Sequence, residues 1–119
     1  MVQENNPFFG RRVFFLYPPS VIQDELVHEL IKNGYEIYIL RDHSKVHSLL
    51  TEFNDSVLFI NIDKALTQPQ WEEFIDSLVS DKKLSNVKLG ALTYNIDDEL
   101  EKKFKEVIRL PYGYIRLKI

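Results

Sequence analysis

The chain has 119 residues, of which 45% are hydrophobic and 28% charged, a composition that suits a single folded domain with one core. Its formal net charge of -3 argues against a nucleic-acid-binding surface, which usually carries a basic patch. The absence of cysteine excludes disulfides, thiolate zinc sites and thiol catalysis, and no apolar run is long enough to cross a bilayer. With a polar N-terminus as well, we expect a cytoplasmic protein that binds neither membrane nor nucleic acid.

Five short apolar runs organise the sequence, and helix-period stretches follow the first four. After an N-terminal arm over residues 1–10, the runs are Val13–Tyr17, Tyr35–Leu40, Val57–Ile62, Val87–Tyr94 and Gly113–Lys118. Strands that alternate with amphipathic helices build a parallel sheet. The sequence therefore predicts one α/β domain over residues 11–119. The expected fold is a flavodoxin-like, doubly wound sheet of five strands in the order 2-1-3-4-5.

The last helix is expected to begin at Asp97 and to continue through Val107 and Ile108, because apolar residues recur there at helical spacing. The fifth apolar run then ends the chain, so the helix that would cover one face of the sheet is missing. We expect an exposed apolar face there. We expect this face to be covered by Phe8 and Phe9 of the arm, by a second copy in a homodimer, or by a helix of a longer parent chain.

The layout resembles that of response-regulator receiver domains, and the resemblance covers residues 11–119. A working receiver has an acidic pair after the first strand that holds Mg²⁺, and a phosphorylated aspartate at the end of the third. A threonine or serine ends the fourth strand, and a lysine lies in the fifth. The metal neutralises phosphate charge, which is why the acidic pair is required.

Most of these positions carry the wrong chemistry in this chain. In order, they fall on Tyr17 and Pro18, on Asn61, on Thr93, and on Leu117 with Lys118 one residue late. Only Thr93 matches. Asp63 would be presented on the same sheet face as Asn61 if the third strand continued, which makes it the alternative phospho-acceptor. The resemblance implies a degenerate receiver, or pseudo-receiver.

Four short segments of the sequence more specifically resemble the N-terminal module of a group of bacterial PilZ-domain proteins. These segments are Gly10–Pro18, Phe59–Asp63, Gln70–Glu72 and Tyr112–Lys118. In that group a receiver-like module precedes a cyclic di-GMP-binding PilZ domain, whose RxxxR and D/NxSxxG motifs are absent here. The resemblance implies a regulatory fragment that does not itself bind cyclic di-GMP and that works through a protein partner or a downstream domain. Tyr112 and Tyr114, near the expected fifth strand, are candidate interface residues.

Two alternatives remain open. One is a true receiver phosphorylated on Asp63, and the other is a small enzyme or nucleotide-binding protein on a flavodoxin-like fold. Against the latter, Tyr17–Ser20 replaces a glycine-rich phosphate loop after the first strand, and its prolines lack amides. His43 and His47 are four residues apart, but two ligands do not complete a metal site. We therefore expect a signalling module with no catalytic activity, cofactor or metal.

Overall fold

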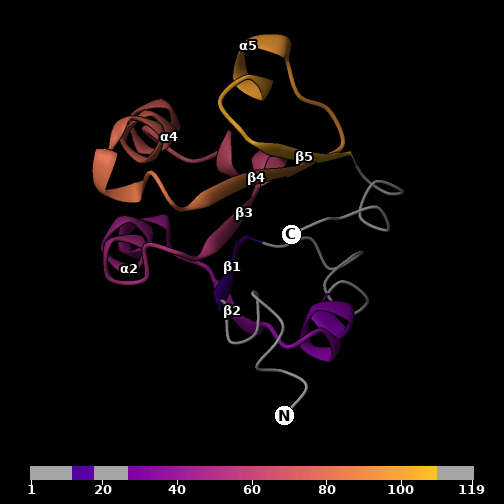
Figure 1. Ribbon diagram of the computed structural model, residues 1–119. Coiled ribbons are helices and arrows are strands. Elements are labelled where there is room, and N and C mark those ends of the chain that lie inside the picture. The colour runs from indigo at the N-terminus through magenta and orange to yellow at the C-terminus, as the bar shows by residue number, and fades with distance from the viewer. Residues whose placement is uncertain (1–11, 18–26, 110–119) are drawn as a thin grey trace.

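The computed structural model describes residues 12–17 and 27–109 of the chain. These residues form a five-stranded sheet, all of whose neighbouring strands are parallel, in the order β2-β1-β3-β4-β5 (Figure 1). The strands are β1 (Arg12–Leu16), β2 (Glu36–Leu40), β3 (Val57–Asn61), β4 (Lys88–Thr93) and β5 (Glu106–Arg109). The predicted fold class and strand order are confirmed.

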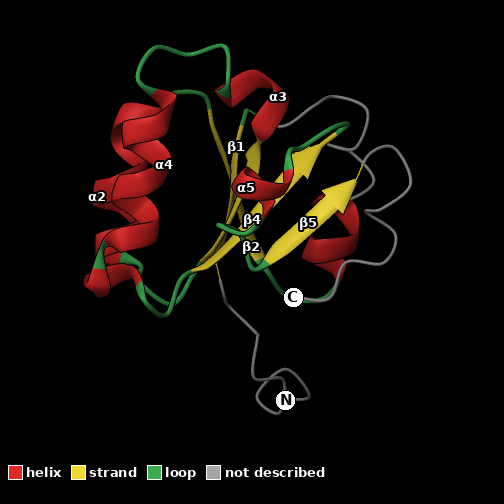
Figure 2. Ribbon diagram, turned by 90° about the horizontal axis from the view of Figure 1, so that it is seen from above, coloured by secondary structure: helices red, strands yellow, loops and turns green. Residues whose placement is uncertain are grey.

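Helices cover both faces of the sheet. The helices are α2 (Val46–Glu52), α3 (Ile62–Ala65), α4 (Trp71–Ser80) and α5 (Asp98–Glu101), with short 3₁₀ turns η2 (His43–Lys45) and η3 (Lys82–Leu84). Residues 27–32 are also helical. Figure 2 shows α2 and α4 side by side on one face of the sheet, with the helix of residues 27–32 on the other. No described helix is long and apolar enough to span a bilayer.

The central strands are buried on both faces, as their continuous apolar sequences predict. Side chains alternate along β1, so Phe14 and Leu16 belong to the core cluster that also contains buried residues of α2, α3, α4 and α5. Val13 and Phe15 pack on the opposite face. Among helical residues 27–32, Leu30 is the one buried in this second cluster. By contrast β2 is partly exposed along its length, which fits its position at the edge of the sheet.

Local signals in the sequence set several element ends. The Asp42 carboxylate accepts a hydrogen bond from the backbone N–H of Ser44 at the start of η2, and Asp97 does the same for Leu100 at α5. Gly34 has a φ of 90° after the helical residues 27–32, a conformation that glycine adopts without steric cost.

The expected position of the fifth strand, Gly113–Lys118, is wrong. The structure places β5 at Glu106–Arg109, within the stretch expected to be helical, and α5 ends after four residues at Glu101. The apolar residues of this stretch recur at helical spacing, but they also include neighbouring β-branched residues that suit a strand. Pairing with the open edge of β4 is available to a strand and not to a helix, and that tertiary contact prevails.

This shift removes the basis for expecting a missing last helix. The chain does not stop at its fifth strand, because residues 110–119 follow Arg109. Those residues lie outside the described part of the structure, as does the arm with Phe8 and Phe9. The expectation of a homodimer over an uncovered apolar face therefore has no support from the position of β5.

Replacing Gly90 with alanine is expected to lower the free energy of unfolding by about 1–3 kcal/mol, the usual cost of overpacking a core. A Cβ at this position in β4 would clash with the Phe59 ring, which is fully buried and stacked on Phe15. Urea denaturation measures the change. Adding Phe59→Leu to Gly90→Ala should cost less than the sum of the two single changes, and strict additivity would show that the ring is not the obstacle.

Candidate functional site

Four polar side chains gather where β1, β3 and β4 end, the edge at which parallel sheets of this kind carry their functional groups. They belong to Tyr17, Asn61, Asp63 and Thr93. The Asn61 side chain hydrogen-bonds to the backbone of Tyr17, and the Thr93 hydroxyl hydrogen-bonds to the Asp63 carboxylate. Pro18 and Lys118, the other members of the expected receiver pocket, lie outside the described residues.

Asn61 is the last residue of β3 and joins two neighbouring elements. Its Nδ2 donates to the carbonyl oxygen of Tyr17 at 2.8 Å, which ties the end of β3 to the end of β1. Its Oδ1 accepts from the backbone N–H of Lys64 at 3.3 Å and so caps α3. The amide at the phospho-acceptor position thus serves as a structural bridge.

Asp63 reaches the site by a route that the sequence analysis did not foresee. The expectation that β3 continues to Asp63 is wrong, because α3 begins at Ile62 and places Asp63 in its first turn. From there Oδ1 accepts a hydrogen bond from the Thr93 hydroxyl and Oδ2 accepts one from the backbone N–H of Tyr94, both at 2.9 Å. Both carboxylate oxygens therefore hold the end of β4.

Thr93 is completely buried and is the residue at which the receiver pattern and this sequence agree. Its hydroxyl lies 2.9 Å from Asp63 Oδ1 and 2.7 Å from the carbonyl oxygen of Asn95, so two acceptors compete for one proton. The hydroxyl oxygen also accepts from the backbone N–H of Asn95 at 3.0 Å. The hydrogen bonds of this hydroxyl fix the turn after β4.

Tyr17 occupies the position of the acidic pair with a φ of 56°, which is unusual for a residue other than glycine. Three contacts fix it: its N–H donates to Leu40, its carbonyl accepts from Asn61, and its hydroxyl hydrogen-bonds His43 Nδ1 at 2.8 Å. The His43 ring in turn lies 5.1 Å from the ring of Phe74 in α4. Tyr17 is therefore an aromatic anchor at the end of β1.

The two histidines do not form a metal site. His43 is bound to Tyr17, whereas His47 Nε2 lies 2.6 Å from Asp81 Oδ2 and connects α2 to the segment after α4. Hydrogen bonds from the Lys83 backbone and from His47 lower the pKa of Asp81 below its ordinary value. In the described ranges, no three histidine or carboxylate side chains are grouped closely enough to hold a metal ion.

Mg²⁺ coordination of the receiver kind does not fit the residues present. That chemistry needs several hard anionic oxygens, whereas this edge offers a phenol, an amide and one carboxylate with both oxygens already hydrogen-bonded. The described edge lacks the second carboxylate that would share the ion.

The lysine position also changes with the corrected fifth strand. Lys118 is not in β5, whose residue opposite Thr93 is Arg109. The Arg109 guanidinium pairs with Glu101 of α5 and is about half exposed. The described fifth strand therefore carries an arginine that is engaged with a neighbouring helix.

Comparison with solved structures finds several similar chains. The chain matches the structure titled "Crystal structure of response regulator from Desulfuromonas acetoxidans" with a TM-score of 0.66 and 13% sequence identity, over 91% of this chain and 89% of that one. This chain has the receiver fold. At this identity the likeness concerns the fold alone. No family model and no curated protein matches the chain.

Sequence reasoning found Tyr17, Asn61, Asp63 and Thr93 as members of the site but missed how they connect. It also missed His43 as the partner of Tyr17, for which the sequence holds no signal because the two residues meet only in the folded sheet. The candidate interface residues Phe8, Phe9, Tyr112 and Tyr114 lie outside the described residues, so their role stays a prediction.

The contact between Asp63 and Thr93 is expected to contribute about 0.5–1 kcal/mol to folding, less than is usual for a charge-assisted hydrogen bond, because the carboxylate is exposed. A double-mutant cycle of Asp63→Ala and Thr93→Val, followed by urea denaturation, measures this coupling. Valine keeps the shape of threonine, so it tests the hydroxyl. A coupling energy of zero would mean that the two side chains contribute independently.

Proposed function

We propose that this receiver-fold chain is a non-catalytic regulatory module of the cytoplasm that acts through protein contact. One observation carries the proposal: the polar groups at its carboxyl edge are engaged in holding the fold. Asn61 bridges β1 and α3, and Asp63 bridges α3 and the end of β4. A phosphorylatable edge needs a free nucleophilic carboxylate beside a metal, and these residues supply neither.

The alternative of a receiver phosphorylated on Asp63 is less well supported. Phosphorylation would have to remove a carboxylate oxygen from Thr93 or from the Tyr94 amide, without a second carboxylate nearby to bind Mg²⁺. An enzyme or nucleotide-binding protein is also disfavoured. The residue that follows β1 is a tyrosine held by His43, in place of a glycine whose backbone amide could approach a phosphate.

Incubation with Mg²⁺ and acetyl phosphate is expected to leave the intact mass of the protein unchanged. The Asn61→Asp variant restores an aspartate at the end of β3, but we expect it to stay unmodified as well, because Tyr17 still occupies the metal position. A phosphorylatable receiver treated in parallel is the positive control. A phosphoryl adduct that disappears in the Asp63→Asn variant would contradict the proposal and support the alternative.

We further propose that the module is the N-terminal part of a PilZ-type cyclic di-GMP effector and transmits or receives its signal through the neighbouring domain. The support is the resemblance of the four sequence segments, and the receiver fold is compatible with it. Recovery of the complete reading frame tests this assignment directly, since a sequence without a downstream PilZ domain would refute it.

The 119-residue chain is expected to show no saturable heat when titrated with cyclic di-GMP in a calorimeter. Tight binding of its two phosphates favours clusters of arginine that make bidentate contacts. The two arginines described in the sheet, Arg12 and Arg109, are each paired with a glutamate and lie on strands at opposite sides of β3. A micromolar or tighter dissociation constant would refute the assignment of nucleotide binding to another domain.

A further inference from the structure

A surface groove of about 290 Å³ lies away from the carboxyl edge, between the end of α4, the turn η3, the start of β4 and the segment that follows α5. Its volume is just below the usual range for small-molecule pockets. Its walls come from residues 78–89 and from Lys103 and Lys105, two segments that are separate in sequence, so the groove exists only in the folded domain.

The floor of the groove is apolar. Leu84 and Leu89 are buried beneath it, whereas Val79 of α4 faces it with 45% of its surface exposed. Val79 is among the few large hydrophobic residues of the described chain that are exposed to this degree. A ligand that covers Val79 would therefore gain from burial of apolar surface.

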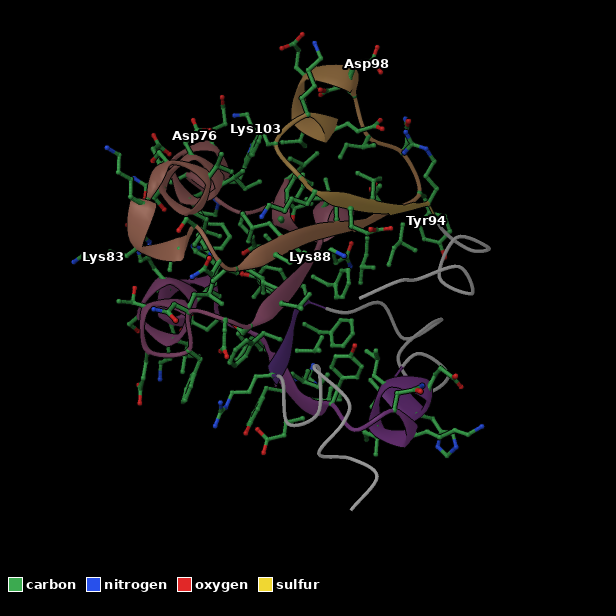
Figure 3. The ribbon with its side chains drawn as sticks, in the orientation of Figure 1. Asp76, Lys83, Lys88, Tyr94, Asp98 and Lys103 are labelled. Atoms are coloured by element: carbon green, nitrogen blue, oxygen red, sulfur yellow. The ribbon has the colours of Figure 1, made fainter. Side chains whose placement is uncertain are left out.

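The rim of the groove is basic. Lys82, Lys103 and Lys105 line it, although the protein as a whole has a net charge of -3. Asp76 of α4 holds Lys103 in an ion pair, which Figure 3 shows between α4 and the segment after α5. Within the described residues, Lys82 and Lys105 have no carboxylate at salt-bridge distance.

Asp81 is the acidic side chain that lines the groove, and its own contacts satisfy it. One of its oxygens lies 2.6 Å from His47 Nε2, and the other accepts from the backbone N–H of Lys83 at 2.9 Å. The groove therefore combines an apolar floor with three lysines and one aspartate, and two of the lysines, Lys82 and Lys105, form no ion pair with another described residue.

We propose that this groove binds an acidic segment of a partner protein, with an apolar side chain of that segment over Val79 and its carboxylates at Lys82 and Lys105. The acidic residues of the segment complement the charge of the lysines, and its apolar side chain complements the apolar floor. The inference rests on the proposed function, since it gives a regulatory module a surface for contact and states the chemistry of its partner.

A small phosphate-like anion fits the groove less well than such a segment. Sites for small anions typically use arginine forks or the backbone amides of a helix N-terminus. This groove adjoins the C-terminal end of α4, where the helix dipole favours the lysines and not an anion. An isolated anion would also leave Val79 uncovered.

Titration of the ¹⁵N-labelled chain with three synthetic peptides tests the proposal by NMR. The first peptide carries leucine and phenylalanine among glutamates, the second replaces the glutamates with lysines, and the third replaces the apolar residues with serines. We expect the first peptide to shift the amide signals of Val79, Leu84, Leu89 and Lys105. The apparent affinity of the chain for each of the other two peptides should be at least about tenfold weaker.

Paired charge-reversal variants provide the matched control. Lys82→Glu with Lys105→Glu should weaken binding of the first peptide by at least about tenfold. Lys45→Glu with Lys102→Glu makes the same change in net charge at exposed lysines outside the groove and should leave binding within about twofold. Dispersed spectra of both variants establish that each is folded.

Four results would overturn the proposal: no shifts with the first peptide at millimolar concentration, shifts confined to other surfaces such as that around Tyr94, equal shifts with inorganic phosphate alone, or loss of binding in both charge-reversal variants. These results leave the proposed absence of phosphorylation untouched. Conversely, a phosphoryl adduct on Asp63 would overturn the proposed function while the peptide titration still reported on the groove.

Discussion

The side-chain amide of Asn61 is the contact on which the carboxyl edge of this sheet depends. It joins the end of β1 to the end of β3 and starts α3 in the same place. Because α3 begins there, Asp63 lies one residue into a helix and its carboxylate reaches the end of β4. Three neighbouring strands are thus joined by two polar side chains.

Such an edge is suited to rigidity more than to switching. A switch needs an element with two arrangements of similar free energy, and a ligand that prefers one of them. Here donors and acceptors of the edge satisfy one another, and the described residues contain no buried side-chain nitrogen or oxygen left without a partner. A regulatory role is then more naturally carried by surfaces whose groups remain available, such as the basic rim beside α4.

The sequence alone predicted the first four strands well because each is a short apolar run bounded by turn residues, and both faces of the central strands are buried. It failed at Glu106–Arg109, where helical and strand periodicities overlap and the edge of β4 decides. That Tyr17, Asn61, Asp63 and Thr93 lie near one another at the carboxyl edge was also predictable, because they follow neighbouring parallel strands. Their contacts were not, because the position of Asp63 depends on where β3 ends, and the groove combines lysines from separate segments.

The backbone conformation of Tyr17 determines which other residues position 17 could accept. Its left-handed conformation is one that aspartate and asparagine tolerate better than aromatic residues do. The main chain after β1 would therefore accept a carboxylate without rearrangement. The identity of the side chain at position 17, and not the course of the backbone there, is therefore what keeps a carboxylate from the end of β1.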